Sequence, residues 1–211
     1  MVDGCLDKPT VNKIIEAAVK LFSLKGLAGV SVKELAEAAG VNVALISYYF
    51  GGKEKLYSYI IEHQLMVMGK ELETIHRKTQ DPVEKIRLFV YTAVAIHKQN
   101  PHIDLLLYRE LFSPTDCFEA IVKVEAERLH EFLDGCIRAA MASGKFRRDL
   151  DIHCATISLF SMIHFTFFTR CLPNTKLCAK EDQEEYYVEQ ALEIYFNGVM
   201  SPGAKRGARP S

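Results

Sequence analysis

Residues 31–56 constrain the fold of this chain more than any other segment, because they read as two short helices joined by a tight turn. Their sequence is SVKELAEAAGVNVALISYYFGGKEKL. Ser31, with Glu34 three residues later, is typical of a capping box at a helix start. Gly40 ends that helix, and Asn42 is placed to cap the next one. This spacing predicts a helix-turn-helix unit, whose second helix lies in the major groove of DNA.

The remainder of the chain also has helical character, and almost no segment is typical of a strand. Gly, Pro and Asn separate stretches whose apolar residues recur every three or four positions. Thr10 is expected to cap the first helix. We expect helices over residues 11–24, 31–39, 43–50, 53–79, 82–98, 102–112, 118–142, 150–170 and 181–200, with a loop over 172–180.

The predicted fold class is therefore all-α. Residues 1–56 are expected to form an N-terminal three-helix helix-turn-helix DNA-binding domain, and residues 57–200 a larger C-terminal helical domain. Residues 201–211, which are rich in Gly, Pro and basic side chains, are expected to be a disordered basic tail. Residues 1–60 hold seven Lys against six Asp or Glu, so the predicted DNA-binding domain is only faintly basic.

Several other classes of protein fit the sequence poorly. The six cysteines show no CxxC spacing, and Asp3 and Asp7 interrupt any apolar leader, so we expect reduced thiols in a cytoplasmic protein. Residues 152–169 lack charged side chains but hold His, Ser and Thr, which favours a buried helix over a membrane span. His153, Cys154, Cys171 and Cys178 match no compact metal finger, so we predict no metal site.

Motifs of catalysis are also missing. The sequence has no GxSxG, no HExxH and no phosphate-binding glycine loop, and its seven histidines are scattered. We therefore predict that the protein is not an enzyme and needs no cofactor.

The candidate DNA contacts lie on the outer face of the second helix, away from Ile46 and Phe50. Ala44 is small enough to allow close approach, and Val43 and Leu45 are suited to contact thymine methyl groups. The helix has no Arg or Gln for bidentate base contacts, so readout would depend on apolar contacts, water or DNA shape.

Polar side chains around that helix are suited to the DNA backbone. Ser47 is suited to hydrogen-bond with a base or a phosphate, and Tyr48 and Tyr49 offer hydroxyls to phosphates. We expect Tyr49 to be the half-buried one of the two tyrosines. Lys33 and Lys53 lie near helix N-termini, where backbone N–H groups already favour a phosphate.

The segment GVNVALISYYFGGKEKLY, residues 40–57, resembles the signature of the TetR/AcrR (tetracycline-repressor-type) transcriptional regulators. Residues 14–26, IIEAAVKLFSLKG, and the G-x4-S step that follows them are similar to the same family, so the resemblance covers about residues 8–60. The family often has Tyr at the position of Ser47, and Tyr48 is suited to compensate. With the cap residue included, the predicted DNA-binding residues are Ser31, Lys33, Asn42, Val43, Ala44, Leu45, Ser47, Tyr48, Tyr49 and Lys53.

The same resemblance implies a helical body with a ligand cavity in each subunit and a dimer formed by the last two helices. Those helices would be residues 150–170 and 181–199, packed with their copies as a four-helix interface. The alternative is that their apolar stripes pack only within one subunit. A cavity for a hydrophobic small molecule would be lined by Leu106, Tyr108, Arg109, Phe112, Phe118, Phe160, Met162, His164, Phe165 and Phe168.

Arg109 has two interpretations: it holds an anionic ligand, or it pairs with a neighbouring group or a helix end. For the whole chain, the resemblance implies a homodimeric transcriptional repressor. It would bind a palindromic operator in double-stranded DNA and be released by a small hydrophobic effector. The alternative is a helical protein-interaction module without specific DNA binding.

Overall fold

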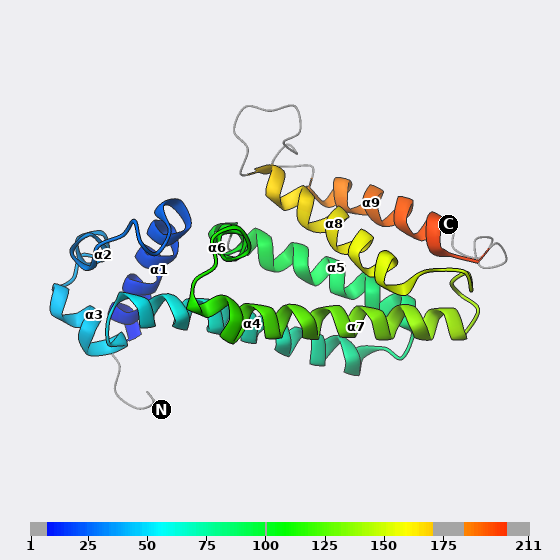
Figure 1. Cartoon of the computed structure of the whole chain (residues 1–211), viewed down its shortest axis with the longest axis horizontal. Helices are drawn as coiled ribbons and strands as arrows, with labels where there is room; N and C mark the ends of the chain where they lie inside the picture. The colour runs from blue at the N-terminus through cyan, green and yellow to red at the C-terminus, as the bar shows by residue number, and fades with distance from the viewer. Residues whose placement is uncertain (1–7, 100, 171–183, 202–211) are drawn as a thin grey trace. The chain divides into compact units, whose positions relative to one another are not determined.

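The computed structural model describes residues 8–99, 101–170 and 184–201, and in these ranges every element is a helix. The all-α prediction is confirmed (Figure 1). The elements are α1 (Lys8–Lys25), α2 (Val32–Ala39), α3 (Val43–Phe50), α4 (Lys53–Lys78), α5 (Pro82–Gln99), α6 (Pro101–Phe112), the π-helical turn η1 (Phe118–Val122), α7 (Lys123–Ala142), α8 (Ile152–Arg170) and α9 (Glu184–Val199).

The predicted helices match these bounds closely, with one error of capping. Thr10 was expected to precede the first helix, but α1 already begins at Lys8, so Thr10 lies in its first turn. Pro9 does not prevent this earlier start, since proline is tolerated in a first helical turn, where its missing N–H costs nothing. The expected loop over 172–180 and nearly all of the expected tail fall outside the described residues.

The capping residues of α2 and α3 act as their chemistry predicts. The Ser31 hydroxyl accepts the N–H of Glu34 at 3.1 Å, and the Asn42 side chain accepts the N–H of Ala44 at 2.9 Å. Gly40 follows α2 with a φ of 64°, a left-handed conformation that glycine adopts without strain. The Glu34 carboxylate forms an ion pair with Lys25 on α1. The turn between the two short helices is therefore fixed by local hydrogen bonds.

The chain forms two compact units, each with its own core. The first, here called the head unit, comprises Met1–Val67 and Asn100–Val124. Its core includes Phe22 of α1 and Tyr57 of α4, whose rings meet edge to face at 5.2 Å. Because α6 packs against α1, a helix far along the sequence belongs to the head unit. The predicted domain boundary after residue 56 stays a prediction.

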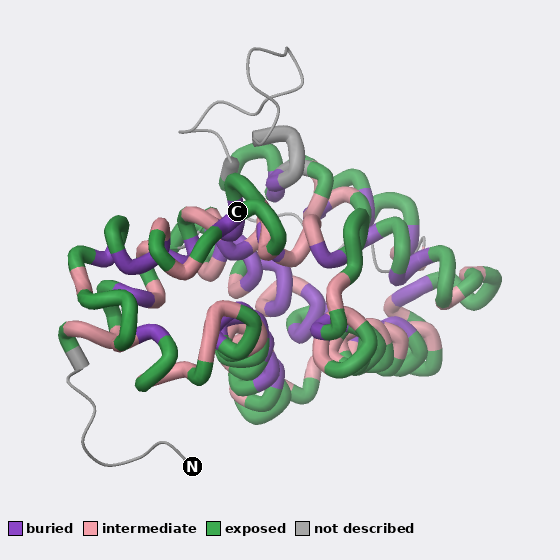
Figure 2. Tube along the Cα trace, turned by 60° about the vertical axis from the view of Figure 1, so that its left-hand side comes forward, coloured by how far each residue is buried: buried purple, intermediate pink, exposed green. Residues whose placement is uncertain are grey.

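The second unit, here called the body unit, comprises Met68–Gln99 and Glu125–Ser211. The helix pair α8 and α9 packs side by side, and α5 also contacts α9 (Figure 1). Buried segments run along the inward sides of the helices, with exposed segments on their outer sides (Figure 2). In the described residues, no helix combines the length and the hydropathy needed to cross a bilayer.

Candidate nucleic-acid interface

The second helix of the motif, α3, has one buried side and one solvent-facing side. Ile46 is fully buried in the head core, whereas Val43 is 48% exposed and Tyr48 is 78% exposed. Ala44 and Ser47 are also exposed. We call these four exposed residues the reading face. A helix of eight residues that is fixed at both ends and leaves this face open is the geometry that major-groove recognition requires.

Leu45 and Tyr49 are half-buried and pack against the head core, as expected for Tyr49. The Tyr49 ring meets the Tyr48 ring edge to face at 5.1 Å. Such aromatic pairs favour one orientation of the rings. Tyr49 therefore supports the more exposed Tyr48.

The two predicted lysines differ in their surroundings. Lys33 lies on α2 with its side chain 83% exposed and a weak ion pair of 3.8 Å to Glu37, which leaves it free to meet a phosphate. Lys53 instead donates to the backbone carbonyls of Leu27 and Val30, at 3.2 and 2.9 Å. It therefore holds the turn between α1 and α2 in place. Its predicted contact with DNA stays a prediction.

Ser31 and Asn42 carry capping roles and keep spare hydrogen-bonding capacity. Each side-chain oxygen accepts one backbone N–H, so the Ser31 hydroxyl proton and the Asn42 amide protons remain for another partner. Both residues are exposed and stand at helix N-termini, where the helix dipole favours a phosphate. The geometry is compatible with the predicted backbone contacts of both residues.

The residues predicted to line a ligand cavity are divided between the two units. Leu106 is buried in the head core and Phe118 packs against it, whereas Phe160 packs against the body core. Phe112 is 78% exposed. Tyr108, Met162 and His164 are half-buried, Phe165 is exposed, and the side chain of Phe168 lies outside the described residues. That these residues line one cavity stays a prediction.

Arg109 pairs with a helix end, which was the second of the two roles expected for it from the sequence. Its guanidinium donates to the carbonyls of Ser23 and Leu24, at 2.7 and 2.6 Å. These carbonyls belong to the last turn of α1, where backbone acceptors have no partner within the helix. Arg109 therefore caps α1 from α6 and is occupied within the head unit.

The sequence interpretation missed a buried polar network next to Arg109. Glu110 is fully buried and accepts hydrogen bonds from the Tyr57 hydroxyl at 2.6 Å and from the Thr115 hydroxyl at 3.0 Å. Burial, together with the bond to Glu110, raises the pKa of Tyr57 far above its usual value. In the sequence, the polar pair Arg109-Glu110 within an apolar segment was the sign that could have predicted this network.

An exposed reading helix on a helical body defines the class of helix-turn-helix transcriptional regulators. The family model for bacterial regulatory proteins of the tetR family matches residues 14–60. The model for the C-terminal domain of the HTH-type transcriptional dual regulator CecR matches residues 82–196, more than half of the chain. The chain therefore belongs to the TetR family of bacterial regulatory proteins, with a body of the CecR type.

Individual relatives agree with this assignment. YttP of Bacillus subtilis, named a probable HTH-type transcriptional regulator, is 38% identical over 104 residues, which cover 48% of this chain and 50% of YttP. The HTH-type transcriptional regulator BetI of Brucella canis is 28% identical over 58% of this chain and 63% of BetI. The chain thus spans less than two thirds of either relative. The HTH-type transcriptional repressor NicS of Pseudomonas putida is 26% identical over 74% of each chain.

Solved structures share this fold over most of the chain. The ketosteroid transcriptional regulator KstR2 of Mycobacterium tuberculosis aligns with a TM-score of 0.76 at 16% identity, covering 95% of this chain and all of that one. The hemolysin II transcriptional regulator HlyIIR aligns with a TM-score of 0.70 at 23% identity, covering 92% and 98%. At these identities the likeness shows the fold alone.

Proposed function

We propose that this protein is a homodimeric repressor that binds a palindromic operator in double-stranded DNA and is released by a small effector. The observation that carries the proposal is the reading face of α3, which stays exposed although Val43 and Ala44 are apolar. Val43, at 48% exposure, and the Tyr48 ring, at 78%, are the two large groups that α3 leaves in solvent.

The chemistry of the reading face favours DNA as that partner. Val43 and Ala44 are suited to contact thymine methyl groups, and the hydroxyls of Ser47 and Tyr48 are suited to bases or phosphates. Lys33 adds a solvent-facing charge on α2, the helix before α3. We infer that the contacts are few and that shape and deformability of the operator contribute to specificity.

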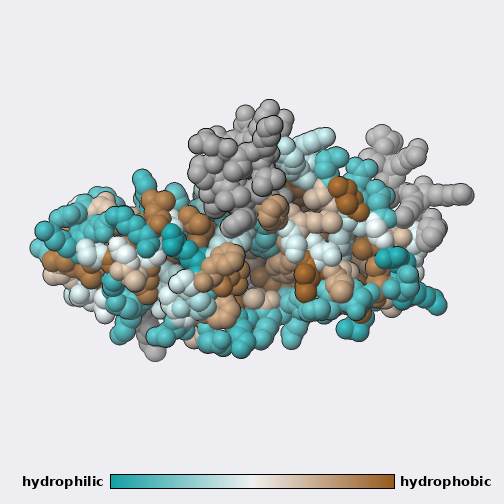
Figure 3. All heavy atoms as spheres, turned by 45° about the horizontal axis from the view of Figure 1, so that its top comes forward, coloured by the Kyte–Doolittle hydropathy of each residue, from teal (hydrophilic) through white to brown (hydrophobic). Residues whose placement is uncertain are grey.

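The dimer is supported by apolar side chains on the outer sides of α8 and α9. Ile157 and Phe165 on α8 are exposed, as are Tyr186, Tyr187 and Ile194 on α9. Hydrophobic residues also interrupt the hydrophilic surface in Figure 3. Burying this face against a second copy would remove it from water and place two α3 helices about a two-fold axis. NicS is named a repressor, and this supports repression as the direction of regulation proposed for this protein.

Fluorescence anisotropy with duplex DNA from the region upstream of the protein's own gene tests the proposal. We expect salt-dependent, saturable binding that the Tyr48→Ala change weakens about five- to 150-fold, because a lost base or phosphate contact is worth about 1–3 kcal/mol. Tyr91→Ala is the matched control, since Tyr91 is an exposed tyrosine of α5 and its loss should change nothing. No salt-dependent DNA binding would contradict the proposal and favour the protein-interaction module.

A further inference from the structure

The body unit contains a pocket that the predicted ligand residues do not line. Its volume is about 350 Å³, toward the small end of the range of about 300–1,000 Å³ found for ligand sites. It lies between the end of α4, the start of α5 and the middle of α7. The lining residues that matter for its chemistry are His76, Lys85, Glu131, Phe132, Gly135 and Cys136.

Lys85 is the unusual member of this set, because it is a cation that is only 8% exposed. Its Nζ lies 3.3 Å from Nδ1 of His76, which accepts one of the three ammonium protons when the imidazole is neutral. Among the described residues, no carboxylate forms an ion pair with Lys85. A buried ammonium with unused donors is costly, and a carboxylate in the pocket would offset that cost.

Gly135 lies in the exposed part of the pocket lining. It lies inside α7 without a positive φ, so its backbone does not require glycine. A Cβ added there meets nothing within 4 Å. A methyl group therefore fits at this position without a clash, whereas a large side chain would extend over the pocket.

The remaining walls define which anion fits. Phe132 packs on Phe89 at a ring distance of 6.2 Å and offers a fixed apolar surface. Burial raises the pKa of the Cys136 thiol to about 11, against the opposing effect of Lys85, so this thiol is neutral and acts as an apolar wall. Glu131 is exposed in the lining, and its negative charge disfavours a ligand with a second anionic group.

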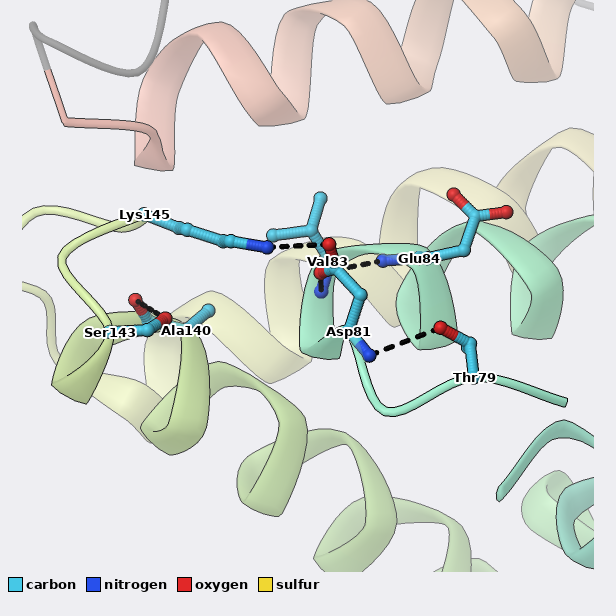
Figure 4. A network of polar contacts seen from close by, with 7 residues as sticks. All are labelled: Thr79, Asp81, Val83, Glu84, Ala140, Ser143 and Lys145. Atoms are coloured by element: carbon cyan, nitrogen blue, oxygen red, sulfur yellow. Dashed lines mark hydrogen bonds and ion pairs between the residues drawn. The ribbon is translucent and has the colours of Figure 1, made fainter. Parts of the chain in front are cut away.

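The start of α5, which carries Lys85, is fixed in place (Figure 4). The Asp81 carboxylate accepts the N–H of Val83 at 2.9 Å and forms an ion pair with Lys145. The N–H of Asp81 in turn donates to the Thr79 hydroxyl at 3.1 Å. A cation held on a rigid helix start needs little reordering when a ligand binds, which favours affinity.

We propose that this pocket binds a small organic monocarboxylate. The carboxylate would accept the free protons of Lys85, and the apolar part would lie against Phe132 and Cys136. Its use as the effector site rests on the proposed function, whereas the binding itself does not.

Isothermal titration calorimetry of the full chain without DNA tests the proposal, with benzoate and hexanoate as probes. We expect saturable binding of at least one probe, and at least about tenfold weaker binding of benzyl alcohol and phthalate, which lack the anion or add a second one. Gly135→Phe should fill the pocket and abolish binding, while Gly135→Ala should retain it. Lys85→Met should weaken binding about tenfold or more, while Lys78→Met, an exposed lysine of α4, should not.

Two results would overturn the proposal. One is the absence of binding of both probes to the unmodified protein at millimolar concentration. The other is equal binding of a probe to the unmodified protein and to the Gly135→Phe variant. Circular dichroism checks that this variant folds. If Lys85→Met does not fold, the Gly135→Phe result alone decides the question. DNA binding is measured in a separate assay. The calorimetric result for carboxylate binding can therefore be interpreted even if the repressor proposal fails. Adding the bound carboxylate to the anisotropy assay then shows whether it lowers DNA affinity.

Discussion

The hydroxyl of Tyr57 on α4 donates a hydrogen bond of 2.6 Å to the fully buried carboxyl group of Glu110 on α6. Glu110 also accepts the backbone N–H of Thr115 at 3.2 Å. Two helices and the turn before η1 are thereby tied together inside the head unit. Because a buried carboxyl group without partners is costly, each of these donors is expected to stabilise the fold.

The Tyr57→Phe substitution removes one donor and keeps the ring that packs on Phe22. We expect the free energy of unfolding to fall by about 1–3 kcal/mol, because Glu110 loses a buried partner. Urea denaturation measures this change, with Tyr91→Phe on the surface as the control. Equal stability of Tyr57→Phe and the unmodified protein would show that the bond contributes nothing.

Arg109→Met should loosen the end of α1 by removing both hydrogen bonds to the carbonyls of Ser23 and Leu24. We expect a loss of about 1–3 kcal/mol and faster amide hydrogen exchange in the last turn of α1. Arg109→Lys should rescue only part of the loss, since an ammonium lacks the planar fork of the guanidinium. Unchanged exchange in that turn, with Arg138→Met as the exposed control, would refute the capping role.

Asn42 has two roles that one pair of variants separates. Asn42→Ala should cost about 1 kcal/mol of stability, because α3 loses its cap. Asn42→Asp should keep the cap and the stability, yet weaken DNA binding, because it adds a negative charge at the N-terminus of α3. Thermal unfolding and anisotropy are measured on both. Undiminished DNA affinity of Asn42→Asp would remove residue 42 from the interface.

The ion pair with Lys145, helped by the backbone N–H of Val83, lowers the pKa of Asp81 below its usual value. A group with a lowered folded-state pKa stabilises the fold above its unfolded pKa of about 3.9, and this contribution disappears as the pH falls through the folded-state value. Asp81→Asn should therefore destabilise the protein at pH 6 more than at pH 2.5. Chemical denaturation at both pH values, with Asp149→Asn as the exposed control, shows whether the difference exists.

Local chemistry explains which features were predictable from the sequence. Ser31, Gly40 and Asn42 act on neighbours two to four residues away, so the helix-turn-helix geometry follows from the sequence itself. Lys53 and Arg109 bind carbonyls 23 to 86 residues away, and no periodicity reveals such pairs.

The ligand residues illustrate a second limit. Leu106 and Phe160 are both apolar helix residues, and only the tertiary fold separates them into different cores. The pocket at Lys85 requires α7 to meet the consecutive helices α4 and α5, about 50 residues earlier in the sequence. A lone lysine at the start of an amphipathic helix gives no sign of burial, so this site was missed.

The most direct test of DNA recognition by α3 is a hydroxyl-radical footprint of the protein on its operator. The account predicts two protected segments related by two-fold symmetry, with centres about ten base pairs or a multiple of that apart. The Tyr48→Ala variant should lose this protection at concentrations where Tyr91→Ala keeps it. A single unsymmetric footprint, or full protection by Tyr48→Ala, would contradict the account.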